Sequence, residues 1–287
     1  MAVVISSFFQ ILLLSCGPLV VLGLAVYFCR ALFSFFLGRE QGRQLQLLFL
    51  APSAPLREIA HALAAMLFFH SVSEVGFLEL HDPNGELSFV EHSYNPRNPV
   101  ALLGNFVYAL APLAFLLFLC YLVLITCFGD VMGTLGARLA EITAADGGFT
   151  AYAAAALALL PAMLQAEAPL LLKLLGFAVL LFLSMGIFLS LRELLEAFSG
   201  ILIYAVLVLL FSAVLMLFDA RVQRLVLGGL RSFATAVTAL GVVVLLAVAT
   251  LLLLGAVFFL VRILFFTTPE GSGQGNALTV YRENENN

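Results

Sequence analysis

The sequence predicts an all-α polytopic membrane protein of about six transmembrane helices, with a short β-hairpin near residues 75–92. The chain is 63% hydrophobic with a mean hydropathy of +1.12, whereas a soluble globular protein is only about half apolar. Several apolar runs reach the roughly 20 residues that cross a bilayer core as a helix. An Asn-Gly turn signal lies between two short strand-like segments.

The elements of the first half follow from apolar runs and from proline. The first crossing is expected over residues 8–36, whose length favours a retained span over a signal peptide. Pro52 and Pro55 interrupt the next apolar run, so the second helix is expected to begin after Pro55 and to reach about Val72. Two strands complete this half, at residues 75–80 and 86–92.

The second half is predicted in the same way. A third crossing is expected over residues 100–128, followed by a polar, glycine-rich loop over 129–150. The alanine-rich run 151–164 is too short to cross, which favours an interfacial or re-entrant helix. Residues 267–287 form a polar tail that is expected to be disordered, which leaves 1–266 as a single transmembrane domain. The remaining crossings are expected at residues 169–189, 194–217 and 235–266.

Charge and cysteine content narrow the choice of partners. The net charge of −4 includes no block of Lys or Arg, so no nucleic-acid partner is expected. The four cysteines lie in or beside apolar runs without C-x-x-C spacing, which favours packing roles.

One short motif stands out within this apolar chain. Arg57-Glu58-Ile59-Ala60-His61 is similar to the H-E-x-x-H zinc motif, with arginine in place of the first histidine. That motif works because positions i and i+4 share a helix face, so two imidazoles bind zinc while the glutamate polarises the bound water. Here one of the two imidazole ligands is missing.

All four histidines fall within residues 61–92, which raises the hypothesis of a metal site. His61 and His70 are nine residues apart and are expected on opposite faces of one helix, where they cannot share an ion unless the helix breaks between them. For His70, His81 and His92, a structural or solvated role is the favoured interpretation. Glu58 and His61 differ, because an ionisable pair inside a membrane helix is costly and indicates function.

A wider set of motifs resembles the integral-membrane zinc metallopeptidases related to the site-2 proteases. The resemblance covers about residues 50–200, and it implies Glu58 as general base, His61 as a zinc ligand and Glu193 as a possible carboxylate ligand. Glu193 stands where the family has an aspartate. The motifs that show the resemblance are the residue 55–65 run, Asn95-Pro96-Arg97-Asn98-Pro99 and Leu110-Ala111-Pro112-Leu113.

The two departures from the family weaken a zinc site. A catalytic zinc normally has three protein ligands, and arginine offers no lone pair. Glu193 also fits a capping box with Ser190. Arg57 has two interpretations: its side chain snorkels to the membrane surface, or it pairs with Glu193 or Glu58 and replaces the charge of the metal.

Three functions remain open from the sequence. The favoured one is a non-catalytic pseudo-metallopeptidase, a scaffold or binding subunit of a membrane complex, with lipid and a membrane-protein partner and no cofactor. The second is an active zinc-dependent intramembrane protease that takes a third ligand from His70, His81 or His92. The third is a transporter or channel subunit in which Glu58 and His61 line a polar path. The expected location is the bacterial cytoplasmic membrane, as a multi-pass protein.

Overall fold

The computed structural model describes residues 2–37, 48–77, 88–129, 131–145 and 149–266. Their fold is helical, with one small antiparallel sheet, as predicted. Within this part of the chain, four helices are long and apolar enough to cross a membrane, so the chain is a multi-pass membrane protein. The expected turn of the hairpin and the polar tail lie outside the described residues. The four helical segments are Val4–Phe35, Pro99–Cys127, Leu191–Leu215 and Ala220–Phe258.

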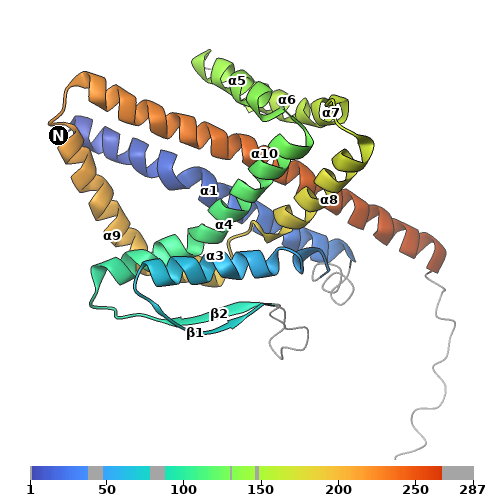
Figure 1. Ribbon diagram of the computed structural model, residues 1–287, viewed down its shortest axis with the longest axis horizontal. Coiled ribbons are helices and arrows are strands. Elements are labelled where there is room, and N and C mark those ends of the chain that lie inside the picture. Colours follow the sequence, from blue (N-terminus) through green and yellow to red (C-terminus); the bar gives the residue numbers. More distant parts are fainter. Residues whose placement is uncertain (1, 38–47, 78–87, 130, 146–148, 267–287) are drawn as a thin grey trace, which may run out of the picture.

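The first half contains one long helix, a short helix, the sheet and a second long helix (Figure 1). The sheet pairs Ser71 with Ser93 and Gly76 with Phe89. Its two strands therefore lie farther from the expected turn than the predicted strands, at residues 75–80 and 86–92, would. The helices are α1 (Ala2–Leu37), α3 (Ala54–Leu67) and α4 (Pro99–Cys127), and the strands are β1 (Ser71–Gly76) and β2 (Phe89–Ser93).

Helix α3 differs from its prediction at both ends. It begins at Ala54, before Pro55, because the first turn of a helix tolerates a proline whose missing N–H would have no partner. It ends at Leu67 instead of Val72, in a Schellman turn in which Phe69 has a φ of 62°. The His70 N–H donates to the Ala65 carbonyl over 2.9 Å, which closes this turn.

The second half contains six further helices, two of which correct the prediction. The expected loop 129–150 contains α5, whose buried Val131, Leu135 and Leu139 recur every four residues along one face. The last helix begins at Ala220 instead of 235, directly after Asp219, which caps it. The helices are α5 (Val131–Ala144), α6 (Phe149–Leu157), α7 (Leu159–Gln165), α8 (Leu170–Gly186), α9 (Leu191–Leu215) and α10 (Ala220–Phe266).

The expected number of about six crossings is not reached by the described long helices. Helix α8 is apolar but has only 17 residues, and α6 and α7 are shorter still, in agreement with a segment that does not cross fully. About six crossings therefore stays a prediction.

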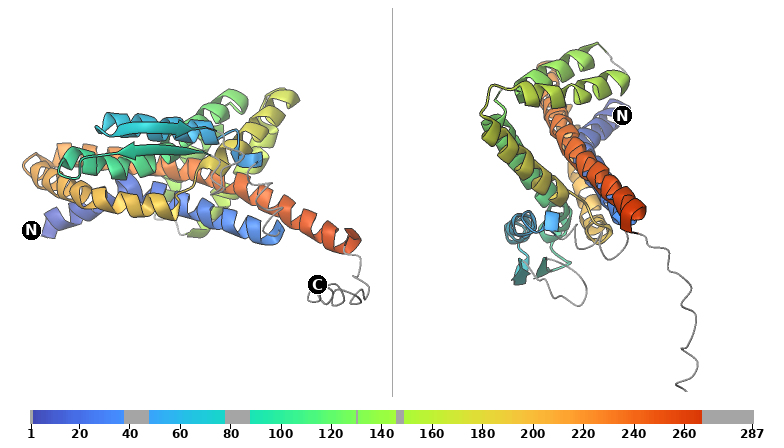
Figure 2. Two further views of the ribbon diagram at one scale, coloured as in Figure 1. Left: turned by 90° about the horizontal axis from the view of Figure 1, so that it is seen from below. Right: turned by 90° about the vertical axis from the view of Figure 1, so that its right-hand side faces the viewer.

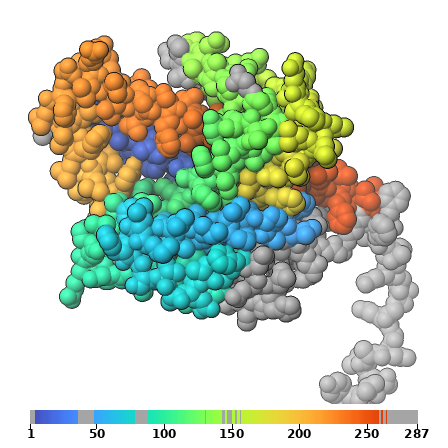
Figure 3. Space-filling model, in the orientation of Figure 1, coloured from blue at the N-terminus to red at the C-terminus, as the bar shows by residue number. Residues whose placement is uncertain are grey.

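Helix α9 is shared by two groups of packed helices. Helix α1 packs along α10 and α9, while α4 packs against α3, α9 and α8. The α4–α9 contact is close, since a Cβ added at Gly200 would lie 2.4 Å from the Leu102 carbonyl oxygen. Figure 2 shows α5–α7 on one side of the molecule and the hairpin on the other. Figure 3 shows α3 and the hairpin side by side on one surface.

Candidate functional site

The candidate site lies where α3 meets a break between α8 and α9. Residues 187–190 leave the helical conformation, and the Leu189 N–H donates to the Gly23 carbonyl of α1 over 3.1 Å. Carbonyls at the end of a helix lack partners within it, so a break inside an apolar protein needs donors from elsewhere. The side chain of Arg57 supplies them.

Arg57 is buried, with 4% of its surface exposed. One guanidinium nitrogen, Nη1, donates to the Gly186 carbonyl over 2.9 Å and to the Phe188 carbonyl over 2.8 Å. The other, Nη2, forms an ion pair with Oε1 of Glu193. The guanidinium also lies 3.9 Å from the centre of the Phe188 ring, an attractive cation–π distance. The interpretation that Arg57 snorkels to the membrane surface is therefore wrong.

Glu193 performs two structural roles at once. Its Oε2 accepts a hydrogen bond from the Ser190 N–H over 2.8 Å, while the Ser190 hydroxyl accepts from the Glu193 N–H, which confirms the predicted capping box. Its Oε1 faces both Arg57 and Nε2 of His61, the latter at 3.0 Å. The cap and the ion pair are not alternatives, because each uses a different carboxylate oxygen.

His61 is held between two oxygen acceptors. Its Nε2 faces Glu193, and its Nδ1 lies 3.1 Å from the Tyr108 carbonyl oxygen. A neutral imidazole donates to one of these oxygens, and an imidazolium donates to both. In either state, a metal bound at Nε2 or Nδ1 would displace one of the two contacts.

Glu58 has a different hydrogen-bond partner from Arg57. It is buried, and its Oε1 accepts a hydrogen bond of 2.9 Å from the Ser88 hydroxyl, just before β2. Burial raises the pKa of Glu58, against the opposing effect of nearby His61 and Arg57. Of the two carboxylates expected near Arg57, Glu193 is the one with an ion pair to it.

The three described histidines, His61, His70 and His92, lie in a layer of aromatic rings under α3. The His70 and His92 rings stack with their centres 5.1 Å apart and their planes 14° apart. Tyr108 lies 4.4 Å from His92 and 4.2 Å from His61. His70 thus follows the helix instead of lying on its opposite face, and it is buried. Burial and the neighbouring His70 lower the pKa of half-buried His92.

The described histidines are not arranged around a common point at which a zinc ion could bind. Nitrogen lone pairs lie in the plane of the imidazole ring, so the nearly parallel rings of His70 and His92 do not converge on one point. Among the described residues, no group of three or more His, Cys, Asp or Glu side chains is arranged to hold a metal. His81, the remaining candidate ligand, lies outside the described residues.

Sequence reasoning missed three neighbours of the site. Arg30 of α1 lies 3.7 Å from the centre of the same Phe188 ring that contacts Arg57. An arginine within the first apolar run was a detectable signal. Phe188 and Tyr108 gave no such signal, because aromatic residues are common in the apolar runs of membrane proteins.

Comparison of the chain with protein-family models, with curated proteins and with solved structures finds no match.

Proposed function

We propose that this chain is a non-catalytic relative of the membrane zinc metallopeptidases, which works as a scaffold or binding subunit of a complex in the bacterial cytoplasmic membrane. One observation supports this most directly: Arg57 and His61 both contact Oε1 of Glu193. Arg57 occupies the motif position of the missing ligand. Its guanidinium forms an ion pair with Glu193, the carboxylate that the family resemblance assigns to the metal.

The electrostatics of this arrangement favour arginine over zinc. A dication placed at Glu193 would lie next to the guanidinium, and like charges at such distances in a low dielectric repel strongly. Zinc binding at His61 would also displace the ring from its contact with Glu193 or with the Tyr108 carbonyl. The ion pair therefore takes over the charge balance that a metal provides in active enzymes.

The geometry favours a structural use of the charge. Arg57 joins α3 to the last carbonyl of α8, to the Phe188 carbonyl in the break and to the first turn of α9 through three polar contacts. These contacts hold α3, the end of α8 and the start of α9 in one fixed arrangement, and they require no catalytic step. A scaffold or binding subunit needs such a fixed arrangement and no chemistry.

The test is the zinc content of the purified full-length protein. We expect wild-type protein to contain no stoichiometric zinc, and we expect Arg57→His combined with Glu193→Asp to gain zinc, because these changes restore both departures from the family. Arg192→His is the matched control, since Arg192 is exposed. Stoichiometric zinc in wild type that disappears in His61→Ala would overturn the proposal.

A further inference from the structure

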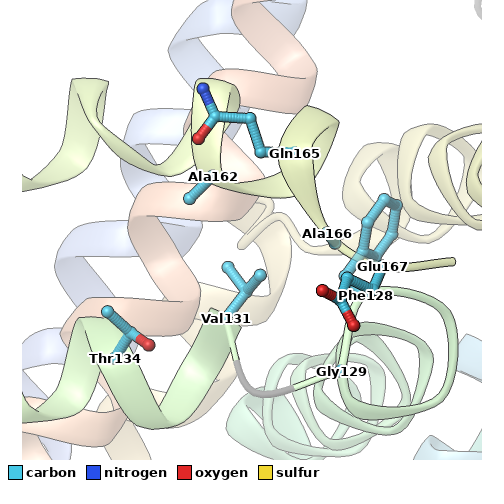
Figure 4. Close-up of a pocket in the computed structure, with 8 residues that line it drawn as sticks. All are labelled: Phe128, Gly129, Val131, Thr134, Ala162, Gln165, Ala166 and Glu167. Atoms are coloured by element: carbon cyan, nitrogen blue, oxygen red, sulfur yellow. The ribbon is translucent and has the colours of Figure 1, made fainter.

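A cavity of about 440 Å³ opens where the termini of three helices meet, away from Arg57. It lies at the carboxyl end of α4, the beginning of α5 and the carboxyl end of α7, and its size is within the range of small-ligand pockets. Figure 4 shows the Glu167 carboxylate beside Phe128 and Gly129. The lining residues are Phe128, Gly129, Val131, Thr134, Ala162, Gln165, Ala166 and Glu167.

The charges around this cavity favour a cation. Glu167 is the charged side chain among the described lining residues, and Gln165 adds an amide. Helices α4 and α7 both end here, and the carboxyl end of a helix carries partial negative charge. The same end of α7 already binds an ammonium group, because Lys173 Nζ donates to the Leu164 carbonyl over 2.7 Å.

The cavity lies beside a surface suited to lipid chains. Helix α4 is one of the four apolar helices long enough to cross, so its end lies near a membrane surface. Helix α8 begins three residues after Glu167. Its first leucines, Leu170 and Leu171, are 72% and 78% exposed, and acyl chains can pack against them.

We infer that this cavity binds the ammonium headgroup of a phospholipid such as phosphatidylethanolamine. A primary ammonium has three donors, which match the Glu167 carboxylate and the backbone carbonyls at the helix ends. The lipid chains then lie along α8. An anionic headgroup is disfavoured by Glu167 and by the carboxyl ends of α4 and α7, against the single amino end of α5. The site is separate from Arg57 and does not depend on the proposed function.

Native mass spectrometry of the full-length protein tests this inference. The protein is titrated with phosphatidylethanolamine and, separately, with phosphatidylglycerol of the same chain length. We expect preferential retention of phosphatidylethanolamine and an about tenfold loss of this affinity in Glu167→Gln, because a charge-assisted hydrogen bond is lost. Glu141→Gln, at an exposed position of α5 outside the cavity, should retain wild-type affinity.

A second variant separates the cavity from the charge. Ala166→Phe fills the space without changing any charge and should reduce binding as much as Glu167→Gln does. Equal retention of the two lipids, or unchanged binding in either variant, would overturn the inference. Displacement of the lipid by free ethanolamine at equal concentration would also overturn it, because the ligand would then be a soluble amine.

Discussion

Arg57 and Glu193 are buried charges whose hydrogen-bonding capacity is largely used. Arg57 reaches two carbonyls besides its carboxylate, and Glu193 accepts from the Ser190 N–H besides its contacts with Arg57 and His61. A buried pair contributes little net stability on its own, because its attraction must offset desolvation. The pair instead fixes the geometry of the site, because removing either partner leaves the other charge buried and uncompensated.

Truncating Arg57 tests that view at the residue scale. We expect Arg57→Met to lower the free energy of unfolding by about 3–5 kcal/mol, because the Glu193 carboxylate stays buried without its cation. The measurement is denaturant unfolding of detergent-solubilised protein. The matched control is Arg192→Met, whose pair with Glu196 is exposed and whose loss should cost under about 1 kcal/mol.

A double variant completes the test. Adding Glu193→Gln to Arg57→Met removes the uncompensated charge while keeping a side chain that can cap α9, so it should recover part of the lost stability. If Arg57→Met proves no more costly than Arg192→Met, the buried ion pair does not form in the folded protein.

At the scale of the element, the end of α3 places the histidine layer. Phe69 has a φ of 62°, a left-handed conformation that is unfavourable for a bulky side chain. The turn directs His70 back beneath the helix, where its Nε2 donates to the Ala101 carbonyl over 2.8 Å. Gly104 leaves room for this approach, because a Cβ there would lie 2.7 Å from His70 Nε2.

Substitution of Phe69 measures the strain in this turn. We expect Phe69→Gly to be more stable than Phe69→Ala by about 1 kcal/mol, because only glycine adopts the left-handed conformation without a Cβ clash. Both variants lose the same exposed ring, so the difference isolates the backbone. Thermal unfolding in detergent is the measurement, and equal stabilities would show that Phe69 is not left-handed in the folded chain.

The elements divide into those that local sequence predicts and those that it does not. Long apolar runs predicted α1, α4 and α9, and Ser190-x-x-Glu193 predicted the cap of α9. The end of α3 was missed because a phenylalanine takes the position that glycine usually holds. The contacts of Arg57 with the α8–α9 break join residues over 120 positions apart, and no spacing rule encodes such contacts. Only the pairing with a carboxylate could be hypothesised, from charge.

At the scale of the whole molecule, the helices differ in their relation to the membrane. Helices α1, α4, α9 and α10 are long enough to cross, whereas α5–α7 together form a set of shorter helices on one side (Figure 1). Helix α10 has 47 residues, a length of about 70 Å at 1.5 Å per residue, more than twice a bilayer core. Part of it therefore extends beyond the membrane or is strongly tilted.

Cysteine labelling in membranes tests this division. In a cysteine-free background, Arg138→Cys on α5 should react with a water-soluble maleimide once both membrane faces are accessible. Leu202 on α9 is 70% exposed, but this surface faces lipid. Leu202→Cys should therefore not react with the same maleimide. Equal labelling at both positions would contradict the assignment of α9 as a crossing helix.

The pairing of Arg57 with Glu193 also constrains how the chain enters its membrane. The two residues are 136 positions apart, so at ordinary translation rates Arg57 leaves the ribosome roughly 7 to 27 seconds before its partner. During that interval an unpaired guanidinium on α3 cannot settle in hydrocarbon at low cost. We therefore expect α3 to stay at the membrane surface until α9 has been made and Glu193 can pair with Arg57.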